Sequence, residues 1–342
     1  MPIYKTVAIF PHCTRQLRGE IESREQPRER MYGLLELGNL DNVEIHFSDS
    51  RFKGLYGKFV SFCRKHGFNP IDLNTAIEIA RADLVVLKDD FSFSASLVAK
   101  LTNTPMVCYD SLFPLPKNSI KKYLIRICIR WSDKIITYSK HQAKKYSLFA
   151  GVPIEKFEAI EFVLDNEFYK TTNPKIPTRP YVLSIGRDTG RDFETLARAC
   201  ALIDLNLKLV TLPYLVKDSI SNSANIEIYQ NISYSKLFEL YSGSTAIVVP
   251  LKEGLDYASG IRAILEAITL NRPVIVSETD YVKANIKASS VIKFVKPENV
   301  SDLAEKLKSG FPNIKKSDFI YLQDDYISNV KKITDIILSS IK

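Results

Sequence analysis

The sequence predicts a doubly wound α/β protein with two domains of the same kind. Short β-branched runs alternate with longer amphipathic segments along most of the 342 residues, a pattern typical of βαβ units around a parallel sheet. The alternation breaks at Pro174, Pro177 and Pro180, which cannot lie inside a helix or a central strand. A chain of this length also exceeds one ordinary hydrophobic core. We therefore expect two Rossmann-like domains joined by a stiff linker.

The proline-rich segment sets the expected domain boundaries. Residues 1–172 form the first domain, 173–180 the linker and 181–325 the second domain, while 326–342 form a C-terminal helix that can cross back to the first domain. Ligands of doubly wound sheets bind outside the carboxyl ends of the strands. We therefore expect the two domains to face a central cleft.

Strands are predicted where apolar β-branched residues cluster, and helices where apolar residues recur at three- and four-residue spacing. In the first domain the strands are Thr6–Phe10, Val43–Phe47, Leu84–Leu87, Met106–Tyr109 and Lys134–Tyr138, and the helices Arg28–Leu37, Thr75–Arg81, Phe93–Leu101, Ser119–Trp131 and Lys140–Phe149. In the second domain the strands are Tyr181–Ile185, Leu207–Leu212, Ile226–Tyr229, Ala246–Pro250, Pro273–Val276 and Val291–Val295, and the helices Phe193–Ile203, Ser235–Tyr241, Ser259–Leu270 and Val300–Lys308. The final helix is Tyr326–Ile341.

Composition excludes several classes of protein. The chain is 45% apolar and 25% charged, as in soluble globular proteins, and no apolar run approaches the roughly 18 residues of a membrane span. Met1–Phe10 leads into strand-like sequence without a signal-peptide layout, so we expect a cytoplasmic protein. The five scattered cysteines and four histidines show no metal-ligand spacing, and no metal site is expected.

The net charge of +8 favours an anionic partner. The positive charge is spread along the chain and no recognition motif for nucleic acid appears, so nucleic acid is not the expected partner. Phosphorylated substrates and an anionic membrane surface remain as possible anionic partners.

A strand, a polar loop and a helix form the first candidate site. The run Ala246–Pro250 ends before the loop, and Ser259 is suited to cap the helix that follows. Gly260 permits close approach to the first turn, where free N–H groups and the helix dipole favour an anion. Glu266 is expected on the polar face about two turns further on, where its carboxylate can accept both ribose hydroxyls of a nucleotide. The candidate residues are Glu253, Tyr257, Ser259, Gly260, Ile261 and Glu266. The alternative is an ordinary capped helix with a solvated Arg262–Glu266 pair.

A second candidate loop follows the first strand of the second domain. Gly186 and Gly190 permit tight turns, and Asp192 can cap the next helix. Arg187 and Arg191 are placed to face the same site as Ser259, where two guanidinium groups suit a diphosphate. The alternative is a pair of surface arginines bridged to neighbouring aspartates.

Together these segments resemble the GT-B glycosyltransferases, particularly the family 4 nucleotide-sugar transferases. The resemblance covers most of the chain after about residue 82. It rests on Gly186-Arg187 with Arg191-Asp192-Phe193, on Pro250-Leu251, Ser259-Gly260, Leu265-Glu266-Ala267 and Arg272-Pro273-Val274-Ile275, and on Trp131 to Ser139, Gly151-Val152-Pro153 and Val163-Leu164-Asp165.

The resemblance implies a nucleotide-sugar co-substrate and no metal or other cofactor. The basic pair would hold the donor diphosphate and Glu266 the ribose. The acceptor would be a hydroxyl of a glycan or a lipid-linked molecule, in the synthesis of a cell-surface polysaccharide or glycoconjugate. Two other functions stay open: a GT-B nucleotide-sugar epimerase, and a catalytically inactive nucleotide-sugar-binding subunit.

Three positions depart from the family pattern. Ala258 replaces a common glutamate, Asn271 replaces a glycine, and Asp110 stands where many members carry histidine. A base for inverting transfer is expected from Asp110, Asp89 or Asp90, each at the end of a predicted strand. Their alternative roles are an Asx turn and a helix cap, and retaining transfer without such a base stays open.

The segment Lys117–Trp131 predicts a basic amphipathic helix. Such a helix can lie on an anionic membrane and bring the enzyme to a lipid-linked acceptor at the inner face of the membrane. Equally, its apolar side can pack on the sheet while its lysines face water.

Overall fold

The computed structural model describes residues 3–48, 58, 60–63, 68–88, 91–109, 115, 118–170, 180–217, 220, 223–255, 257–311, 315–319 and 326–341. These residues divide into two compact units, Met1–Glu161 with Asp324–Lys342, and Phe162–Gln323. The division falls earlier in the chain than the predicted linker, whose residues 173–179 lie outside the described part.

The first unit is built on a six-stranded parallel sheet in the order β2-β1-β3-β4-β5-β6. Its strands are β1 (Tyr4–Ile9), β2 (Val43–Ser48), β3 (Leu84–Lys88), β4 (Met106–Tyr109), β5 (Lys134–Thr137) and β6 (Phe157–Ala159). Its helices are α1 (Arg15–Glu22), α2 (Leu34–Leu37), α4 (Leu73–Arg81), α5 (Phe93–Thr102), α6 (Ser119–Trp131), α7 (Lys140–Ala150) and α15 (Tyr326–Leu338), with 3-10 turns η1 (Arg28–Met31) and η2 (Ile154–Lys156).

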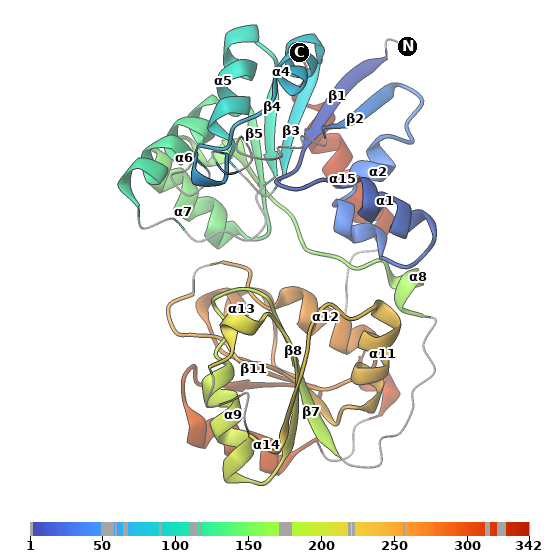
Figure 1. Cartoon of the computed structure of the whole chain (residues 1–342), viewed down its shortest axis with the longest axis vertical. Helices are drawn as coiled ribbons and strands as arrows, with labels where there is room; N and C mark the ends of the chain where they lie inside the picture. The colour runs from blue at the N-terminus through green and yellow to red at the C-terminus, as the bar shows by residue number, and fades with distance from the viewer. Residues whose placement is uncertain are drawn as a thin grey trace. The chain divides into compact units, whose positions relative to one another are not determined.

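Helices cover both faces of this sheet (Figure 1). Helices α4 to α7 share one apolar core with β3, β4 and β5. Helix α15 packs against α2, and the Tyr326 hydroxyl donates to Glu36 Oε1 at 2.9 Å. The C-terminal helix therefore belongs to the first unit.

The second unit repeats the plan with the strand order β12-β11-β10-β7-β8-β9, again all parallel. Its strands are β7 (Tyr181–Ile185), β8 (Asn206–Val210), β9 (Ile226–Tyr229), β10 (Ala246–Val249), β11 (Val274–Ser277) and β12 (Ile292–Val295). Its helices are α8 (Asn166–Tyr169), α9 (Phe193–Leu202), α11 (Tyr234–Gly243), α12 (Ile261–Thr269), α13 (Asp280–Asn285) and α14 (Val300–Ser309), with 3-10 turns η3 (Pro213–Leu215) and η4 (Lys316–Phe319).

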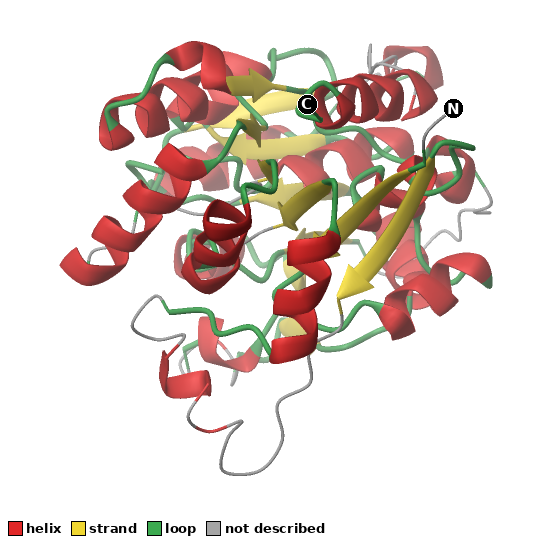
Figure 2. Cartoon of the chain, turned by 90° about the horizontal axis from the view of Figure 1, so that it is seen from above, coloured by secondary structure: helices red, strands yellow, loops and turns green. Residues whose placement is uncertain are grey.

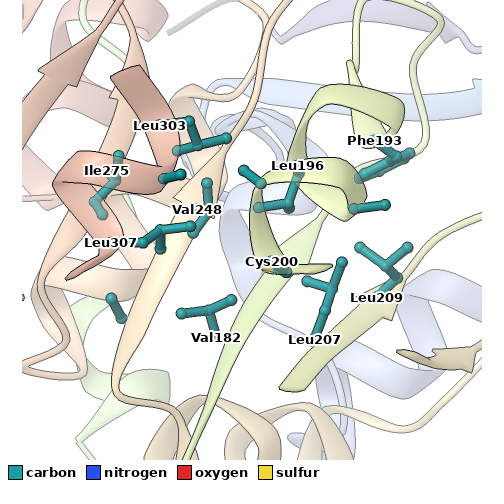
Figure 3. Packing of buried hydrophobic residues seen from close by; sticks show 14 of the residues in the cluster. Val182, Phe193, Leu196, Cys200, Leu207, Leu209, Val248, Ile275, Leu303 and Leu307 are labelled. Carbon is teal, nitrogen blue, oxygen red and sulfur yellow. The ribbon is translucent and has the colours of Figure 1, made fainter. Parts of the chain in front are cut away.

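The core of the second unit lies between the sheet and the helices α9 and α14. Leu196 of α9 and Leu303 of α14 pack against Val248 of the central strand β10 (Figure 3). A fully buried leucine or valine contributes about 1.5–3 kcal/mol relative to exposure. Helices α11 and α12 lie on the other side of this sheet (Figure 1). Figure 2, which colours the chain by secondary structure, shows strands flanked by helices.

The structure confirms the predicted α/β fold and most of the predicted elements, but one helix is wrong. The segment Arg28–Leu37 is a 3-10 turn and a short helix, separated at Tyr32 and Gly33. Both residues have left-handed φ values, 56° and 78°, and this conformation ends a right-handed helix. Helices α1, α8 and α13 and strand β6 were not predicted.

Candidate functional site

Two loops of the second unit meet at the carboxyl edge of its sheet. Strands β7 and β10 are parallel neighbours, so the loops that follow them leave from the same edge. Arg191 and Leu251 form an antiparallel bridge, and the Asp192 amide donates to Pro250 O at 3.1 Å. The two segments that the sequence singled out are thus joined by backbone contacts.

Asp188 holds the two loops together. Its Oδ1 accepts hydrogen bonds from the hydroxyls of Tyr257 at 3.0 Å and Ser259 at 2.9 Å. The same oxygen accepts from the Gly190 amide at 3.0 Å, and Oδ2 lies 3.3 Å from Arg191 Nε. From the sequence, Asp188 was one of the aspartates that could bridge to the neighbouring arginines, and its role between the loops was missed. The position of Asp188 between Gly186 and Gly190, in a loop that follows a strand, could have indicated that it organises this loop.

Arg191 is the buried cation of this site. Its side chain is only 5% exposed, and no described residue accepts a hydrogen bond from its buried Nη1. Burial lowers the pKa of the Arg191 guanidinium, and the charge of Asp188 opposes that shift, yet an arginine keeps its charge in a protein. Asp188 already pairs with this cation, and the unused Nη1 donor still calls for an acceptor, which a bound anion would supply.

Glycines leave the space that Arg191 fills. A Cβ on Gly186 would lie 2.1 Å from Arg191 Nε, and one on Gly260 would lie 3.2 Å from Arg191 Nη1. The guanidinium therefore lies beside the residue that begins helix α12. We call Asp188, Arg191, Tyr257, Ser259 and Gly260 the loop cluster.

The start of α12 differs from the prediction. The N-cap is Gly260, with φ of 84° and no side-chain cap, whereas Ser259 directs its hydroxyl to Asp188. Ser259 as the cap was therefore wrong, because its hydroxyl donates a hydrogen bond to the carboxylate of Asp188. The first N–H groups of a helix have no partner within the helix, and the glycine at this N-cap has no side chain to accept from them.

Glu266 also differs from the prediction. It is 2% exposed and not on a solvated face. Its Oε1 accepts from the Tyr169 hydroxyl at 3.1 Å, and its Oε2 from the Tyr241 hydroxyl at 2.7 Å. Arg262, its partner in the alternative of a capped helix, lies over the Phe162 ring at 5.4 Å. Helical spacing placed Glu266 opposite the apolar stripe, but α8 and α11 cover that side.

The remaining candidates of the second unit are distributed around the loop cluster. Tyr257 and Ile261 are buried, whereas Arg187 and Glu253 are exposed. Asp192 caps α9 as predicted, accepting from the Thr195 amide at 3.1 Å. Only one of the two arginines, Arg191, is therefore enclosed by the site.

One of the departures from the family pattern has a structural explanation. Asn271 has a φ of 55°, a conformation that asparagine tolerates better than most residues other than glycine. Ala258 is 1% exposed.

The three carboxylates proposed as a base lie outside the described residues. Asp89 and Asp90 follow β3, and Asp110 follows β4. The last residues of these strands, Lys88 and Tyr109, are paired in register.

Helix α6 matches its predicted bounds and places its residues on three sides. Leu124, Cys128 and Ile129 are buried, Ile120 and Tyr123 are 53% and 62% exposed, and Lys122 is exposed. Arg126 and Arg130 donate to the carbonyls of Phe149 and Ala150 at 3.0 and 2.9 Å, so they close the end of α7. Lys117 is not among the described residues.

Within the described ranges no helix is long and apolar enough to cross a bilayer. The same residues contain no group of three or more His, Cys, Asp or Glu side chains that could hold a metal ion.

Removing the Asp188 carboxylate is expected to loosen the loop cluster. Asp188→Ala takes the acceptor from Tyr257, Ser259 and the Gly190 amide. Because the Asp188 side chain is 37% exposed, water replaces part of this loss, and the free energy of unfolding should fall by about 1–2 kcal/mol. Urea denaturation measures this change. Glu194→Ala, which removes a surface pair with Lys217, should leave the midpoint nearly unchanged, and equal midpoints for both variants would contradict the role of Asp188.

Comparisons with known proteins support the fold. No protein-family model matches the chain, and no curated protein matches it. A glycosyltransferase from Rickettsia africae has a similar structure, with a TM-score of 0.59, 18% identity and coverage of 100% of this chain and 94% of that one. Anabaena Alr3699/HepE, solved in complex with UDP and glucose, has a TM-score of 0.60 and 14% identity, and the match covers 97% of this chain and 95% of that one.

An enzyme of another activity is similar to the same degree. The UDP-GlcNAc 2-epimerase from Methanocaldococcus jannaschii has a TM-score of 0.57 and 13% identity, and the match covers 98% of this chain and 99% of that one. At such identities the likeness concerns the fold. The chain therefore has the two-domain α/β fold of the GT-B glycosyltransferases, which these nucleotide-sugar epimerases share.

Proposed function

We propose that the chain is a nucleotide-sugar-dependent glycosyltransferase, of the general class of hexosyltransferases, whose donor diphosphate binds at the loop cluster. The observation that carries the proposal is the buried Arg191 beside the first turn of α12. Its Nη1 has no acceptor among the described residues, and the adjacent helix start has no side-chain cap. Cation and helix dipole together favour a phosphate at this point.

The donor ribose is assigned to Glu266. Tyr241 orients this carboxylate, because its hydroxyl donates to Glu266 Oε2 at 2.7 Å. A carboxylate accepts hydrogen bonds from vicinal hydroxyls. Diphosphate and ribose would therefore bind at neighbouring points of α12.

Transfer of the sugar leaves additional negative charge on the departing nucleoside diphosphate. Arg191 and the N-terminus of α12 are fixed before the reaction, so they stabilise that charge without reorganisation. We propose that transfer needs no metal, and activity should survive EDTA. If transfer inverts the configuration of the anomeric carbon, the base that deprotonates the acceptor hydroxyl is proposed to be Asp89, Asp90 or Asp110. Transfer that retains the configuration is the alternative.

The acceptor is proposed to be a hydroxyl of a glycan or a lipid-linked molecule, in cell-surface polysaccharide or glycoconjugate synthesis, with the protein at the cytoplasmic face of a membrane. The support is the exposed side of α6, where Ile120 and Tyr123 accompany Lys121 and Lys122. A surface with both exposed apolar side chains and lysines suits anionic lipid.

Replacing Lys121 and Lys122 by glutamate together is expected to abolish sedimentation with vesicles containing phosphatidylglycerol. Each lysine near an anionic surface contributes about 1 kcal/mol, so two charge reversals reduce binding at least 30-fold. Lys144→Glu with Lys145→Glu on α7 is the control for charge alone. Equal loss in both double variants would contradict a docking role for α6.

A panel of nucleotide sugars separates the candidate functions. The protein is incubated with UDP-, GDP-, ADP- and dTDP-sugars, and thermal shift, donor hydrolysis and the sugar configuration by NMR are measured. Stabilisation with slow hydrolysis, or transfer to added acceptors, supports the proposal. An inverted sugar carbon with the nucleotide still attached indicates an epimerase, and stabilisation without any turnover indicates an inactive binding subunit. Absence of binding to every donor overturns the proposal.

A further inference from the structure

Both oxygens of the Glu266 carboxylate receive a tyrosine hydroxyl. The donor to Oε1 is Tyr169 of α8, at 3.1 Å, and the donor to Oε2 is Tyr241 of α11, at 2.7 Å. Glu266 itself is 2% exposed. A carboxylate that is removed from water needs such donors, so a ligand hydroxyl that reached one of these oxygens would compete with a tyrosine.

The two tyrosines are held in different ways. Tyr241 is fully buried within the ten-residue helix α11. Burial and the charge of Glu266 raise the pKa of Tyr241 well above its ordinary value, so its hydroxyl keeps its proton and donates to the carboxylate. Tyr241 is thus a fixed part of the second unit.

Tyr169, by contrast, belongs to a short element. Helix α8 has four residues and no side-chain cap at its start, and a helix this short is not stable by itself. The Tyr169 ring is held by aromatic neighbours, with the Phe238 ring centroid at 5.7 Å and the Tyr234 centroid at 6.5 Å.

Tyr169 is also buried, at 1% exposed, but it borders a cavity. The cavity has a volume of about 1000 Å³ and lies at the amino ends of β7, β10 and β11, where Lys170, Arg272 and Phe319 also line it. Open volume therefore lies next to Tyr169.

We propose that Tyr169 occupies, in the nucleotide-free protein, the position at Glu266 Oε1 that a ribose hydroxyl takes in the complex. Tyr241 is a positioning residue that holds Oε2 in both states. The inference rests on the proposed function, because it assigns the ribose to Glu266. Binding then exchanges one hydroxyl donor for another, so the carboxylate remains satisfied while α8 moves aside.

The affinities of two phenylalanine variants test this exchange, and UDP, GDP and ADP serve as probes in titration calorimetry. Tyr169→Phe removes the competing hydroxyl and keeps the ring, so the affinity for the nucleotide that binds should rise about 2- to 12-fold, the equivalent of one neutral hydrogen bond. Tyr241→Phe removes the fixed donor, so the affinity should fall by a similar factor. Tyr214→Phe, at a 72% exposed position, is the matched control.

Inorganic pyrophosphate distinguishes this exchange from a general change in structure. It has no ribose, so both phenylalanine variants should bind it as the unaltered protein does. Hydrogen exchange adds a measurement on the unaltered protein: the amides of α8 should lose protection when nucleotide binds.

The outcomes also separate this inference from the proposed function. If no nucleotide binds the unaltered protein, or if Glu266→Ala binds nucleotide equally well, the ribose assignment fails and the exchange with it. If Glu266→Ala weakens binding but Tyr169→Phe leaves affinity unchanged or lower, the proposed function stands and the exchange is overturned. Unchanged or increased protection of α8 on binding overturns it as well.

Discussion

Replacing Arg191 by alanine is expected to weaken nucleoside diphosphate binding about 100-fold or more and to reduce glycosyl transfer nearly to background. A hydrogen bond between charged groups contributes about 1.5–3 kcal/mol, roughly 10- to 150-fold in affinity, and a guanidinium makes two such bonds to a phosphate group. The loss of turnover should exceed the loss of affinity, because charge on the leaving diphosphate grows in the transition state.

Calorimetry with UDP, GDP and ADP and steady-state assays measure these effects. Arg191→Lys keeps the charge without the paired donors and should recover only part of the affinity. Arg198→Ala removes an exposed arginine from the same region and controls for net charge. If Arg191→Ala is folded and binds nucleotide as tightly as Arg198→Ala, the loop cluster is not the diphosphate site. Adding Arg187→Ala should lower the residual turnover further.

Placing a methyl group on Gly260 is the second change with a large expected effect. Gly260 has a φ of 84°, where an alanine costs roughly 1–2 kcal/mol. Its Cβ would lie 2.6 Å from Val249 Cγ1 and 3.2 Å from Arg191 Nη1, so either the strand or the guanidinium must shift. Overpacking adds about 1–3 kcal/mol. We expect Gly260→Ala to lower both stability and nucleotide affinity.

Gly254 provides a matched control in the same loop. Its φ is 69°, but a Cβ there would have no neighbour within 4 Å. Gly254→Ala therefore carries the backbone strain without the crowding, and it should lose about 1 kcal/mol of stability while nucleotide affinity is kept. Equal affinities for the two alanine variants would contradict the inferred closeness of Gly260 to the bound phosphate.

The meeting of the two candidate loops was predictable because it depends on sheet topology. Residues 186–192 and 250–260 follow strands that the sequence marks clearly, and parallel neighbours release their loops at one edge. The cap at Asp192 was predictable for a similar reason, since its acceptor and the Thr195 amide are three residues apart.

The surroundings of Glu266 were not predictable by the same reasoning. Helical periodicity assigns a polar residue to water when it lies opposite the apolar stripe. The hydroxyls that bury this carboxylate belong to Tyr241 and Tyr169, which are 25 and 97 residues away in the chain. The same holds for Ser259, whose hydroxyl bonds Asp188, 71 residues earlier.

The alternation of strands and helices, the parallel sheets and the loops that carry Arg191 and Gly260 could all be predicted from apolar periodicity and short-range capping. Both act between residues close in the chain. Long-range packing was needed to bury Arg191 with an unused donor, to place Asp188 between the loops, and to cover Glu266 with two tyrosines. Desolvation and hydrogen-bond geometry set those features, and both depend on which distant segments pack together.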